Sequence, residues 1–552
     1  MKLFCYTRTA VKELYDIRLA SSLHLALFDE KSEHYTILNH NSGVLYGKAT
    51  ENDDGSLNPK CLKDFVLLDA DASGVYKVAC IRCDGEGNED PESKGKALLY
   101  STKDFLEYSE PELIYIEEFE QIKKSAAIPL ILPSVDGIHP GNMISISASV
   151  ADRLQKKLLP PVNIGIKVED NVAVSCDKDV QKLTATAIYS DGTTDIKKVR
   201  WDTTNVDFLT PGTYEIFGKV MQPHFEFPIA INRADPCVTR INGKYYYIAT
   251  NDADGNHTLY IRQADTMEAL KDAEEVLLLD SKTYEGIGGL LWAPEFHEIN
   301  GKLYIFHACT PGEFFWEESH VMELKAGGDP MNRSDWSRPK RVVRADGTDI
   351  CEAGKEITLD MTTFEWEGEI YAVWSQRQFL PKDLGAWLYI AKLNPEEPWK
   401  LACEPVVLSK PELGWANNHT FVDEGPFALI RGDKLFLTFS SAAVDVSYVV
   451  GLLQIDKGKD PMNPKNWKKT GYPILTARCV ENEWGTGHNA YVTDEFGTVW
   501  NTYHARPGVD APRSSGIRRV HFDIDGEPVL DLTEEKDLLQ ENKIVKTRVV
   551  VK

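Results

Sequence analysis

Strand-type alternation of apolar and polar residues runs through most of the chain, and in the second half it repeats with a long period. Five segments join a glycine turn to a strand rich in aromatic and β-branched residues, as in INGKYYYIAT and WEGEIYAVWS. The turn glycines are spaced 58, 67, 64 and 65 residues apart: Gly243, Gly301, Gly368, Gly432 and Gly497. A repeat of this length, with one small antiparallel sheet per unit, predicts an all-β chain containing a five-bladed β-propeller.

Each repeat also carries one ionisable residue shortly before its turn glycine. These residues lie 8, 6, 8, 8 and 9 positions upstream of the glycines: Asp235, Glu295, Asp360, Glu424 and His488. Radially arranged sheets present their first strands to a common axis, so the five side chains would converge at one end of a central channel. A single acidic residue at a strand end is common because strand ends are solvated, but five at similar offsets favour a shared site.

The residues before the repeats follow other patterns. Short alternating segments near the N-terminus predict accessory β structure without a site of its own, and VADRLQKKLLPP predicts a helix that ends before Pro160 and Pro161. A following segment with Trp201 and Asp202 resembles bacterial immunoglobulin-like modules. The predicted division is a β-rich accessory region at 1–161, an immunoglobulin-like β-sandwich at 162–228 and the propeller at 229–552.

Two further patterns concern packing. The apolar run LILP at 130–133 predicts burial against a neighbouring domain. The motif DPMNRSDW at 329–336 reappears as DPMNPKNW at 460–467. Both copies fall where one blade passes to the next, so Trp336 and Trp467 are interpreted as packing residues rather than sugar platforms.

Length and charge narrow the function classes. A chain of 552 residues is too long for one hydrophobic core, and 61 basic against 85 acidic residues give a net charge of −24. Such a charge disfavours nucleic acid and anionic membranes as partners and leaves a neutral substrate. The N-terminus lacks the apolar core of an export signal and the ten cysteines are scattered, which predicts a cytoplasmic protein, or a secreted one if the chain is a truncated form.

Paired carboxylates are the chemistry that glycoside hydrolysis needs: one group protonates the leaving oxygen and another acts at the anomeric carbon. The segments RADPCV, LWAPEF, ITLDMTTF, DEGPFAL and GTGHNAYV, followed by GIRRVHFDIDGEPVLD, resemble glycoside hydrolase family 43 in order and spacing. This resemblance covers roughly residues 229–535. It implies a five-bladed propeller with an Asp, Asp, Glu set of catalytic residues.

Carried over residue by residue, the resemblance implies that Asp235 is the general base and Glu424 the general acid. Asp360 would orient the substrate and raise the pKa of the acid. Inversion at the anomeric centre would require the base and the acid to stand about 6.5–9.5 Å apart. The substrate-contacting set would be Trp292, Glu295, Phe315, Trp316, His488 and Arg518.

Metal chemistry is weakly indicated. His488 lies in a G-x-G-H-N pattern that, in similar proteins, faces a calcium ion through water, although calcium prefers oxygen ligands. The resemblance therefore implies no required cofactor, with a structural calcium ion near the axis as the one metal considered. His307, His419 and His504 have no metal-ligand spacing and are interpreted as packing or rim residues.

The resemblance implies an α-L-arabinofuranosidase that acts on plant cell-wall polysaccharides or their oligosaccharides. A β-xylosidase of the same family is the main alternative, because the two sugars present similar hydroxyl groups. A propeller that binds carbohydrate without cleaving it is the alternative from another class. Retention of all three carboxylates disfavours that alternative, since binding alone needs no separated acid and base.

Overall fold

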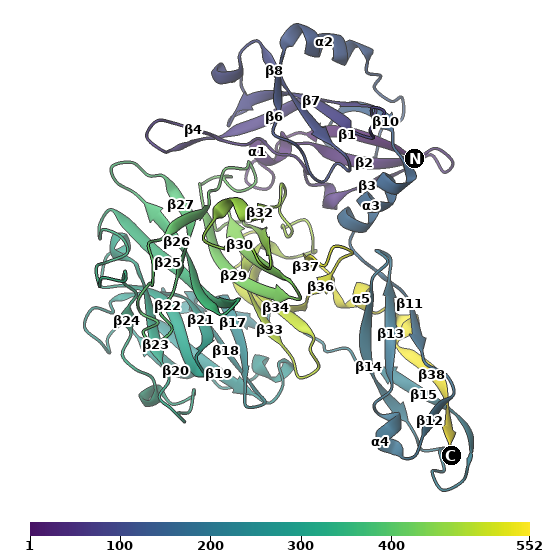
Figure 1. The fold of residues 1–552 in the computed structure, drawn as a ribbon, viewed down its shortest axis with the longest axis vertical. Helices are drawn as coiled ribbons and strands as arrows, with labels where there is room; N and C mark the ends of the chain where they lie inside the picture. Colours follow the sequence, from purple (N-terminus) through teal and green to yellow (C-terminus); the bar gives the residue numbers. More distant parts are fainter. The chain divides into compact units, whose positions relative to one another are not determined.

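The computed structural model describes residues 1–552 and divides into two compact units (Figure 1). The first unit comprises Met1–Ala151 and Glu226–Ile517, and the second comprises Asp152–Phe225 and Arg518–Lys552. The sequence predicts three separate domains, so the structure differs in joining the accessory region to the propeller. No helix combines the length and the apolar character needed to cross a membrane.

The larger part of the first unit is the five-bladed β-propeller predicted from the repeat, with four strands in each blade. The strands of the first four blades, in order, are β17–β20 (Arg233–Ile241, Lys244–Asn251, Thr258–Ala264, Val276–Asp280), β21–β24 (Gly289–Ile299, Lys302–Thr310, Glu318–Glu323, Lys340–Arg341), β25–β28 (Glu356–Trp366, Glu369–Gln378, Gly385–Lys392, Val406–Ser409) and β29–β32 (Asp423–Arg431, Lys434–Ser441, Val449–Asp456, Lys468–Lys469). Each turn between the first two strands of a blade contains its repeat glycine at positive φ, from 59° to 83°, a conformation that glycine adopts without steric cost.

The fifth blade closes the ring with strands from both ends of the propeller sequence. β33 (Trp484–Thr493), β34 (Val499–Arg506) and β35 (Ser514–Arg519) come from its end, and β16 (Ala230–Ile231) comes from its start. β16 pairs antiparallel with β35, with Ala230 opposite Ser515. The hydrogen-bonded closure ties the first and last repeats together and removes two exposed strand edges.

Hydrophobic clusters between neighbouring blades hold the ring together. Trp336 and Trp467 are buried in two of these clusters, and each indole nitrogen donates a hydrogen bond of 2.9 Å to a proline carbonyl in its own DPMN motif. Their interpretation as packing residues is confirmed. The repeated motif therefore places a buried tryptophan between neighbouring blades at two positions of the ring.

The accessory region contains two four-stranded sheets, one hairpin and three short helices. Its elements are β1 (Lys2–Arg8), α1 (Ile17–Ala20), β2 (His24–Asp29), β3 (His34–Ile37), β4 (Thr50–Glu51), β5 (Leu57–Asn58), β6 (Lys60–Leu68), β7 (Tyr76–Asp84), β8 (Lys96–Thr102), β9 (Glu112–Tyr115), α2 (Ile116–Ser125), β10 (Ile138–Ser145) and α3 (Ala148–Leu158). Helix α3 ends before Pro160, as the sequence predicts.

The accessory region shares a hydrophobic core with the propeller, which explains why the two form one unit. Tyr15, Leu19 and Tyr46 belong to the same buried cluster as Trp415 and Phe439 of the propeller. The prediction that LILP is buried is wrong, because Leu130 is 102% exposed and Ile131 is 52% exposed. Contact with the propeller is made instead by aromatic and aliphatic residues near α1.

The second unit is built around one six-stranded sheet of order β11-β13-β14-β15-β38-β12. Its elements are β11 (Asn163–Val168), β12 (Val172–Val174), α4 (Asp177–Val180), β13 (Thr184–Tyr189), β14 (Thr194–Asp202), β15 (Gly212–Val220), β36 (His521–Phe522), β37 (Pro528–Val529), α5 (Glu534–Asp537) and β38 (Ile544–Val551). The predicted propeller boundary at 552 includes β38, but this strand pairs with β15 along eight residues. Alternating buried valines on β38 complete the core of this sheet, so its position follows from packing.

Candidate active site

Every inner strand of the propeller is interrupted by a β-bulge at the same level. The pairing register shifts at 234/237, 292/295, 359/362, 424/427 and 487/490. One residue in each bulge has positive φ, between 45° and 54°: Asp235, Ala293, Asp360, Gly425 and His488. A bulge of this kind turns a side chain out of the regular alternation, and strained bulges concentrate at functional sites.

The bulges correct the register inferred from sequence. Asp235, Asp360 and His488 occupy equivalent bulge positions, whereas the equivalents in the second and fourth blades are Ala293 and Gly425. Glu295 and Glu424 lie beside the bulges and pair with Phe306 and Ser440 of the next strand. The spacing indicates this offset in the second blade, where Ala293 lies eight residues before Gly301 and Glu295 only six. It hides the offset in the fourth blade, where Glu424 lies eight residues before Gly432.

Asp235 is 6% exposed and is surrounded by hydrogen-bond donors and positive charge. Thr250 donates a 2.6 Å hydrogen bond to Oδ2, while Nδ1 of His504 and Nδ1 of His488 lie 3.0 and 3.3 Å from Oδ1. A guanidinium nitrogen of Arg513 lies 3.4 Å from the same oxygen. Burial alone would raise the pKa of Asp235, but His488, Arg513 and His504 together hold it well below its usual value. Asp235 is therefore ionised across the neutral range.

Asp360 and Glu424 experience the opposite balance. Asp360 Oδ2 accepts a 3.0 Å hydrogen bond from the backbone of Gly425, and Tyr448 donates a 2.8 Å hydrogen bond to Glu424. Burial raises the pKa of both carboxyl groups, repulsion from Glu424 adds to the shift at Asp360, and Asp235 raises both. The two groups titrate together and hold a proton to higher pH than isolated carboxyls would.

His488 interacts electrostatically both with Asp235 and with the Asp360 and Glu424 pair. Burial would lower its pKa, but Asp235, Asp360, Glu295 and Glu424 together outweigh this effect and raise it. Its Nε2 atom is buried and has no hydrogen-bond partner in the protein. Calcium prefers oxygen ligands, so this imidazole would approach the expected ion only through a water molecule.

The other predicted substrate contacts fall into two groups. Glu295 is buried and its carboxylate lies 2.8 Å from Nε2 of His297, so it has a protein partner already. Trp292, Phe315 and Trp316 belong to a partly exposed aromatic group beside the second blade, in which the rings of Trp292 and Phe314 are 6.1 Å apart. Trp292 directly precedes the bulge residue Ala293, and this places the aromatic group next to the carboxylates.

Arg518 is the predicted contact for which the structure offers a different residue. A guanidinium nitrogen of Arg518 donates to the carbonyl of Leu530 in the second unit, whereas Arg513 contacts both Asp235 and Asp252. Arg513 directly precedes β35, whereas Arg518 lies near the other end of that strand. The prediction of Arg518 came from the GIRRVHF motif, which covers the end of β35 and not the residue before its start.

Four residues of the site were missed in the sequence. Tyr448, Arg513 and Thr250 carry no repeat signal because they come from second strands or loops. The interpretation of His504 as a packing or rim residue is wrong, since it contacts Asp235 directly. His504 and Thr250 each lie opposite a bulge, on the second strand of their blades, a placement that only the structure reveals.

Glu317 adds a fourth buried carboxyl beside Asp360. It is completely buried, and neither of its carboxylate oxygens has a hydrogen-bond partner in the protein. Burial raises its pKa well above the usual glutamate value, and repulsion from Asp360 adds to this. Glu317 therefore holds its proton to higher pH than an exposed glutamate does.

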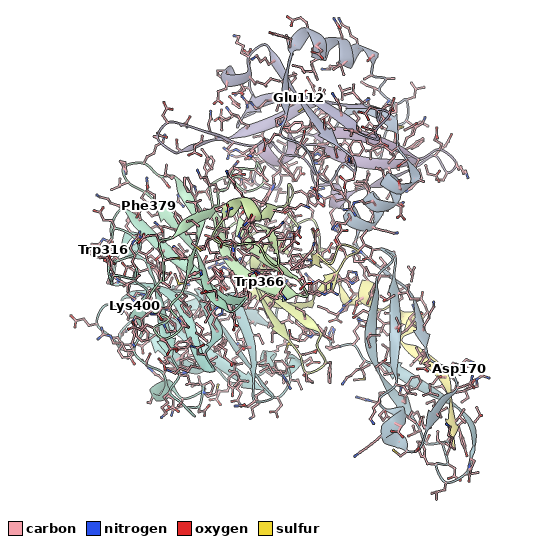
Figure 2. All side chains as sticks on the ribbon, in the orientation of Figure 1. Glu112, Asp170, Trp316, Trp366, Phe379 and Lys400 are labelled. Atoms are coloured by element: carbon pink, nitrogen blue, oxygen red, sulfur yellow. The ribbon has the colours of Figure 1, made fainter.

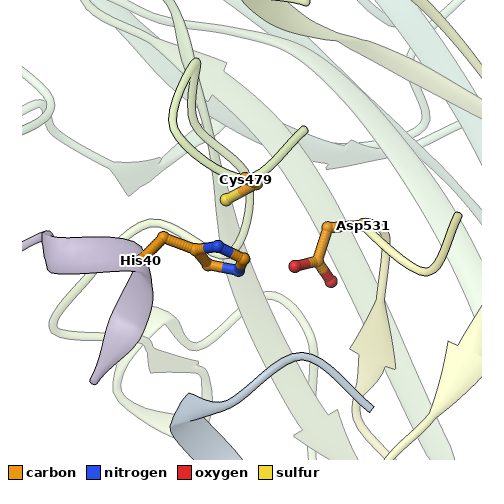
Figure 3. A group of neighbouring side chains, drawn as sticks. All are labelled: His40, Cys479 and Asp531. Carbon is orange, nitrogen blue, oxygen red and sulfur yellow. The ribbon is translucent and has the colours of Figure 1, made fainter. Parts of the chain in front are cut away.

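Two clusters of possible metal ligands lie outside this group. The first comprises His40 and Cys479 of the first unit and Asp531 of the second, which are drawn in Figure 3. In the second unit, Asp523, Asp525 and Glu527 surround the ammonium group of Lys157, which lies 2.7 Å from Glu527. That lysine already supplies the positive charge a metal ion would bring.

Comparison with known proteins agrees with this arrangement. The family model described as glycosyl hydrolases family 43 matches residues 225–528, which is more than half of the chain and includes all five bulges. The chain belongs to glycosyl hydrolases family 43. A second model, the bacterial Ig-like domain (group 4), matches residues 183–223 and confirms the immunoglobulin-like module.

Several proteins that are similar to this family 43 chain are named as arabinofuranosidases. Alpha-L-arabinofuranosidase B of Pyricularia oryzae is 32% identical over 307 residues, covering 54% of this chain and 60% of that protein. The extracellular exo-alpha-(1->5)-L-arabinofuranosidase of Streptomyces chartreusis is 32% identical over 284 residues, covering 51% of this chain and 82% of the relative. Among solved structures, an alpha-L-arabinofuranosidase from Lactobacillus brevis is 29% identical with a TM-score of 0.49, covering 55% of this chain and 95% of its own.

Proposed function

We propose that this family 43 protein is an inverting α-L-arabinofuranosidase that removes terminal or side-chain arabinofuranosyl residues from oligosaccharides or plant cell-wall polysaccharides. The observation that carries the proposal is the opposite pKa shift of neighbouring buried carboxyls: the pKa of Asp235 is lowered, whereas the pKa values of Asp360 and Glu424 are raised. A split of this kind supplies a base and an acid at the same pH. The names of the relatives favour arabinofuranose as the sugar.

In the proposed mechanism, Asp235 accepts a proton from the attacking water as that water adds to the anomeric carbon. Glu424 donates its proton to the departing glycosidic oxygen, and Tyr448 holds the Glu424 carboxyl in place through its hydroxyl group. Asp360 orients the substrate, and its carboxyl group titrates together with that of Glu424. Arg513 and His488 stabilise the negative charge of Asp235 before the proton arrives.

The proposal needs no cofactor and assigns no step to a metal. Calcium remains a prediction from the family resemblance, in which His488 would face the ion through water. Dialysis against a chelator, followed by assay with and without added calcium, tests this point. We expect unchanged kcat/KM, and a loss that calcium restores would establish a metal requirement.

A panel of aryl glycosides tests the proposed activity. We expect hydrolysis of the α-L-arabinofuranoside in preference to the β-xyloside and the galactofuranoside, with proton NMR showing initial release of the inverted anomer. Preference for the β-xyloside would instead establish the β-xylosidase alternative. Binding of these sugars without any hydrolysis would support a carbohydrate-binding propeller and contradict the proposal.

A further inference from the structure

Five aromatic residues form a partly exposed surface at the edge of the candidate active site. Phe314, Phe315 and Trp316 are 39%, 48% and 45% exposed. The ring of Phe379 packs 5.7 Å from that of Phe314 and 4.9 Å from that of Phe315, in edge-to-face geometry. Figure 2 shows Trp316 and Phe379 on neighbouring loops at the same edge of the propeller. We call Trp292, Phe314, Phe315, Trp316 and Phe379 the aromatic platform.

The platform is continuous with the carboxylate group through a short chain of contacts. The ring of Trp292 packs against Phe314 at 6.1 Å. The next residue, Ala293, donates its backbone N–H to Thr250, and Thr250 donates its hydroxyl to Asp235. On the other side, Trp316 directly precedes Glu317, whose carboxyl interacts with Asp360. Both ends of the platform therefore lead to the residues proposed to act on the glycosidic bond.

The accessory region holds the outer loop of the platform. Phe379 begins the loop that follows β26, and Lys382 in this loop forms a 2.6 Å ion pair with Asp54 in the turn between β4 and β5. A second ion pair of 2.7 Å joins Glu51 of the same hairpin to Lys410. The hairpin thus contacts the third blade at the loop between β26 and β27 and at the residue that follows β28.

Resting on the proposed function, we propose that the aromatic platform binds the sugar units of the substrate chain that remain after cleavage, and that the β4–β5 hairpin fixes its outer edge. The ligand is a neutral oligosaccharide, because sugar rings offer apolar C–H faces that pack on aromatic rings, and the chain carries a net charge of −24. A group of partly exposed aromatic side chains beside catalytic residues is typical of a ligand-binding surface. The enzyme therefore favours chains over the free disaccharide.

Chain-length dependence tests the platform. For the full-length protein we expect kcat/KM to rise between linear α-1,5-linked arabinobiose and arabinohexaose. The Phe315→Ala/Phe379→Ala double variant should lose about tenfold in kcat/KM on the hexasaccharide, mainly through KM, and less than twofold on the disaccharide. Phe496→Ala is the matched control, because Phe496 is 56% exposed on the turn between β33 and β34 of the same propeller. It should change neither value.

Calorimetric binding of arabinohexaose and xylohexaose in an Asp235→Asn background separates this proposal from the proposed function. Weaker binding in the double variant supports the platform even if the wild-type protein hydrolyses neither sugar, a result that would overturn only the function. Trp316→Ala provides a second test if the double variant does not fold. Equal losses on short and long substrates, unchanged hexasaccharide binding, or a protein dimer that the double variant abolishes would overturn the platform.

Discussion

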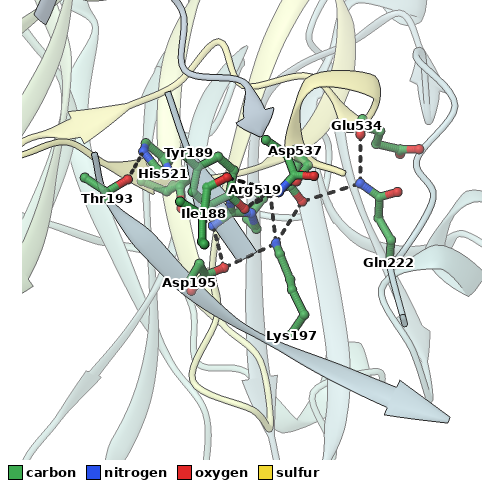
Figure 4. Close-up of polar contacts among 12 residues, drawn as sticks. Ile188, Tyr189, Thr193, Asp195, Lys197, Gln222, Arg519, His521, Glu534 and Asp537 are labelled. Carbon is green, nitrogen blue, oxygen red and sulfur yellow. Dashed lines mark hydrogen bonds and ion pairs between the residues drawn. The ribbon is translucent and has the colours of Figure 1, made fainter. Parts of the chain in front are cut away.

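Each unit contains a buried cluster of charged side chains, and the two clusters differ in how their charges balance. In the second unit, both oxygens of Asp537 lie 2.9 Å from the ammonium group of Lys197, and Tyr189 and Arg519 donate to the same carboxylate (Figure 4). Burial alone would raise the pKa of Asp537, but Arg519 and Lys197 hold it far below its usual value. The Asp537 carboxylate is therefore ionised and has no proton to donate in a reaction.

In the first unit the carboxyls outnumber the cations around them. Arg513 and His488 lie against Asp235, which leaves Asp360 and Glu424 without a direct cationic partner and raises the pKa of both. The comparison teaches that burial alone does not mark an active site. A matched cluster holds chain segments together, whereas an unmatched one keeps a proton available near neutral pH.

The largest expected effect is a loss of turnover when Asp235, in the unmatched cluster of the first unit, is replaced. Asp235→Asn keeps the size of the side chain and removes the base, so kcat on every glycoside should fall by at least about 10³-fold. Thermal unfolding should show a folded protein. Turnover that falls less than tenfold would show that another residue activates the water.

The matched cluster should respond in stability rather than turnover. Asp537→Asn leaves Arg519 and Lys197 buried without their counter-charge, and we expect unfolding of the second unit to become easier by about 3 kcal/mol. Calorimetry measures this change, while kcat/KM at 25 °C should stay within twofold. A large loss of turnover in a folded variant would contradict the division between the two clusters.

A smaller effect concerns Glu317. Because its pKa is raised in the folded protein, its contribution to stability is complete below the usual glutamate pKa and is lost as pH rises through the raised value. Glu317→Gln should therefore raise Tm at pH 8 more than at pH 4. Glu298→Gln, an exposed control on the same blade, should show no such difference.

The smallest effect is expected for an exposed ion pair. Asp54→Lys places two cations together at the platform loop and should lower kcat/KM on arabinohexaose by about twofold, since exposed pairs contribute little. Adding Lys382→Asp restores the attraction and should restore the rate. Failure of this charge swap to restore the rate would show that the hairpin does not act through Lys382.

The sequence predicts the ring and its inner strands because hydrophobic alternation and turn glycines are local features. It also places Asp235, Asp360 and Glu424 on inner strands, which are those of the first, third and fourth blades. It does not predict the bulges, which decide that Gly425 and not Glu424 is the equivalent of Asp235, although Glu424 lies eight residues before its turn glycine just as Asp235 does. Partners that arrive from elsewhere in the ring, such as Arg513 and Tyr448, depend on tertiary packing alone.

Domain limits failed for a related reason. Strand β38 is separated from β15 by more than 300 residues, and no local pattern reports that the two pair. The exposed LILP run likewise has the composition of a buried segment, while contact with the propeller is made by Tyr15, Leu19 and Tyr46. Apolar composition indicates where burial is favourable but not which surface provides it.

The pH dependence of kcat/KM tests the acid and base assignment most directly. It is measured on arabinobiose, whose leaving group needs a proton, and on an aryl arabinofuranoside with a very acidic leaving group, which does not. On arabinobiose the wild-type profile should be bell-shaped: activity falls at low pH as Asp235 gains a proton and at high pH as the Asp360 and Glu424 pair loses one. On the aryl substrate the decline at high pH should be absent, and Glu424→Gln should keep most of its activity there while losing most of it on arabinobiose. Equal losses in Glu424→Gln on the two substrates would contradict the assignment of Glu424 as the acid.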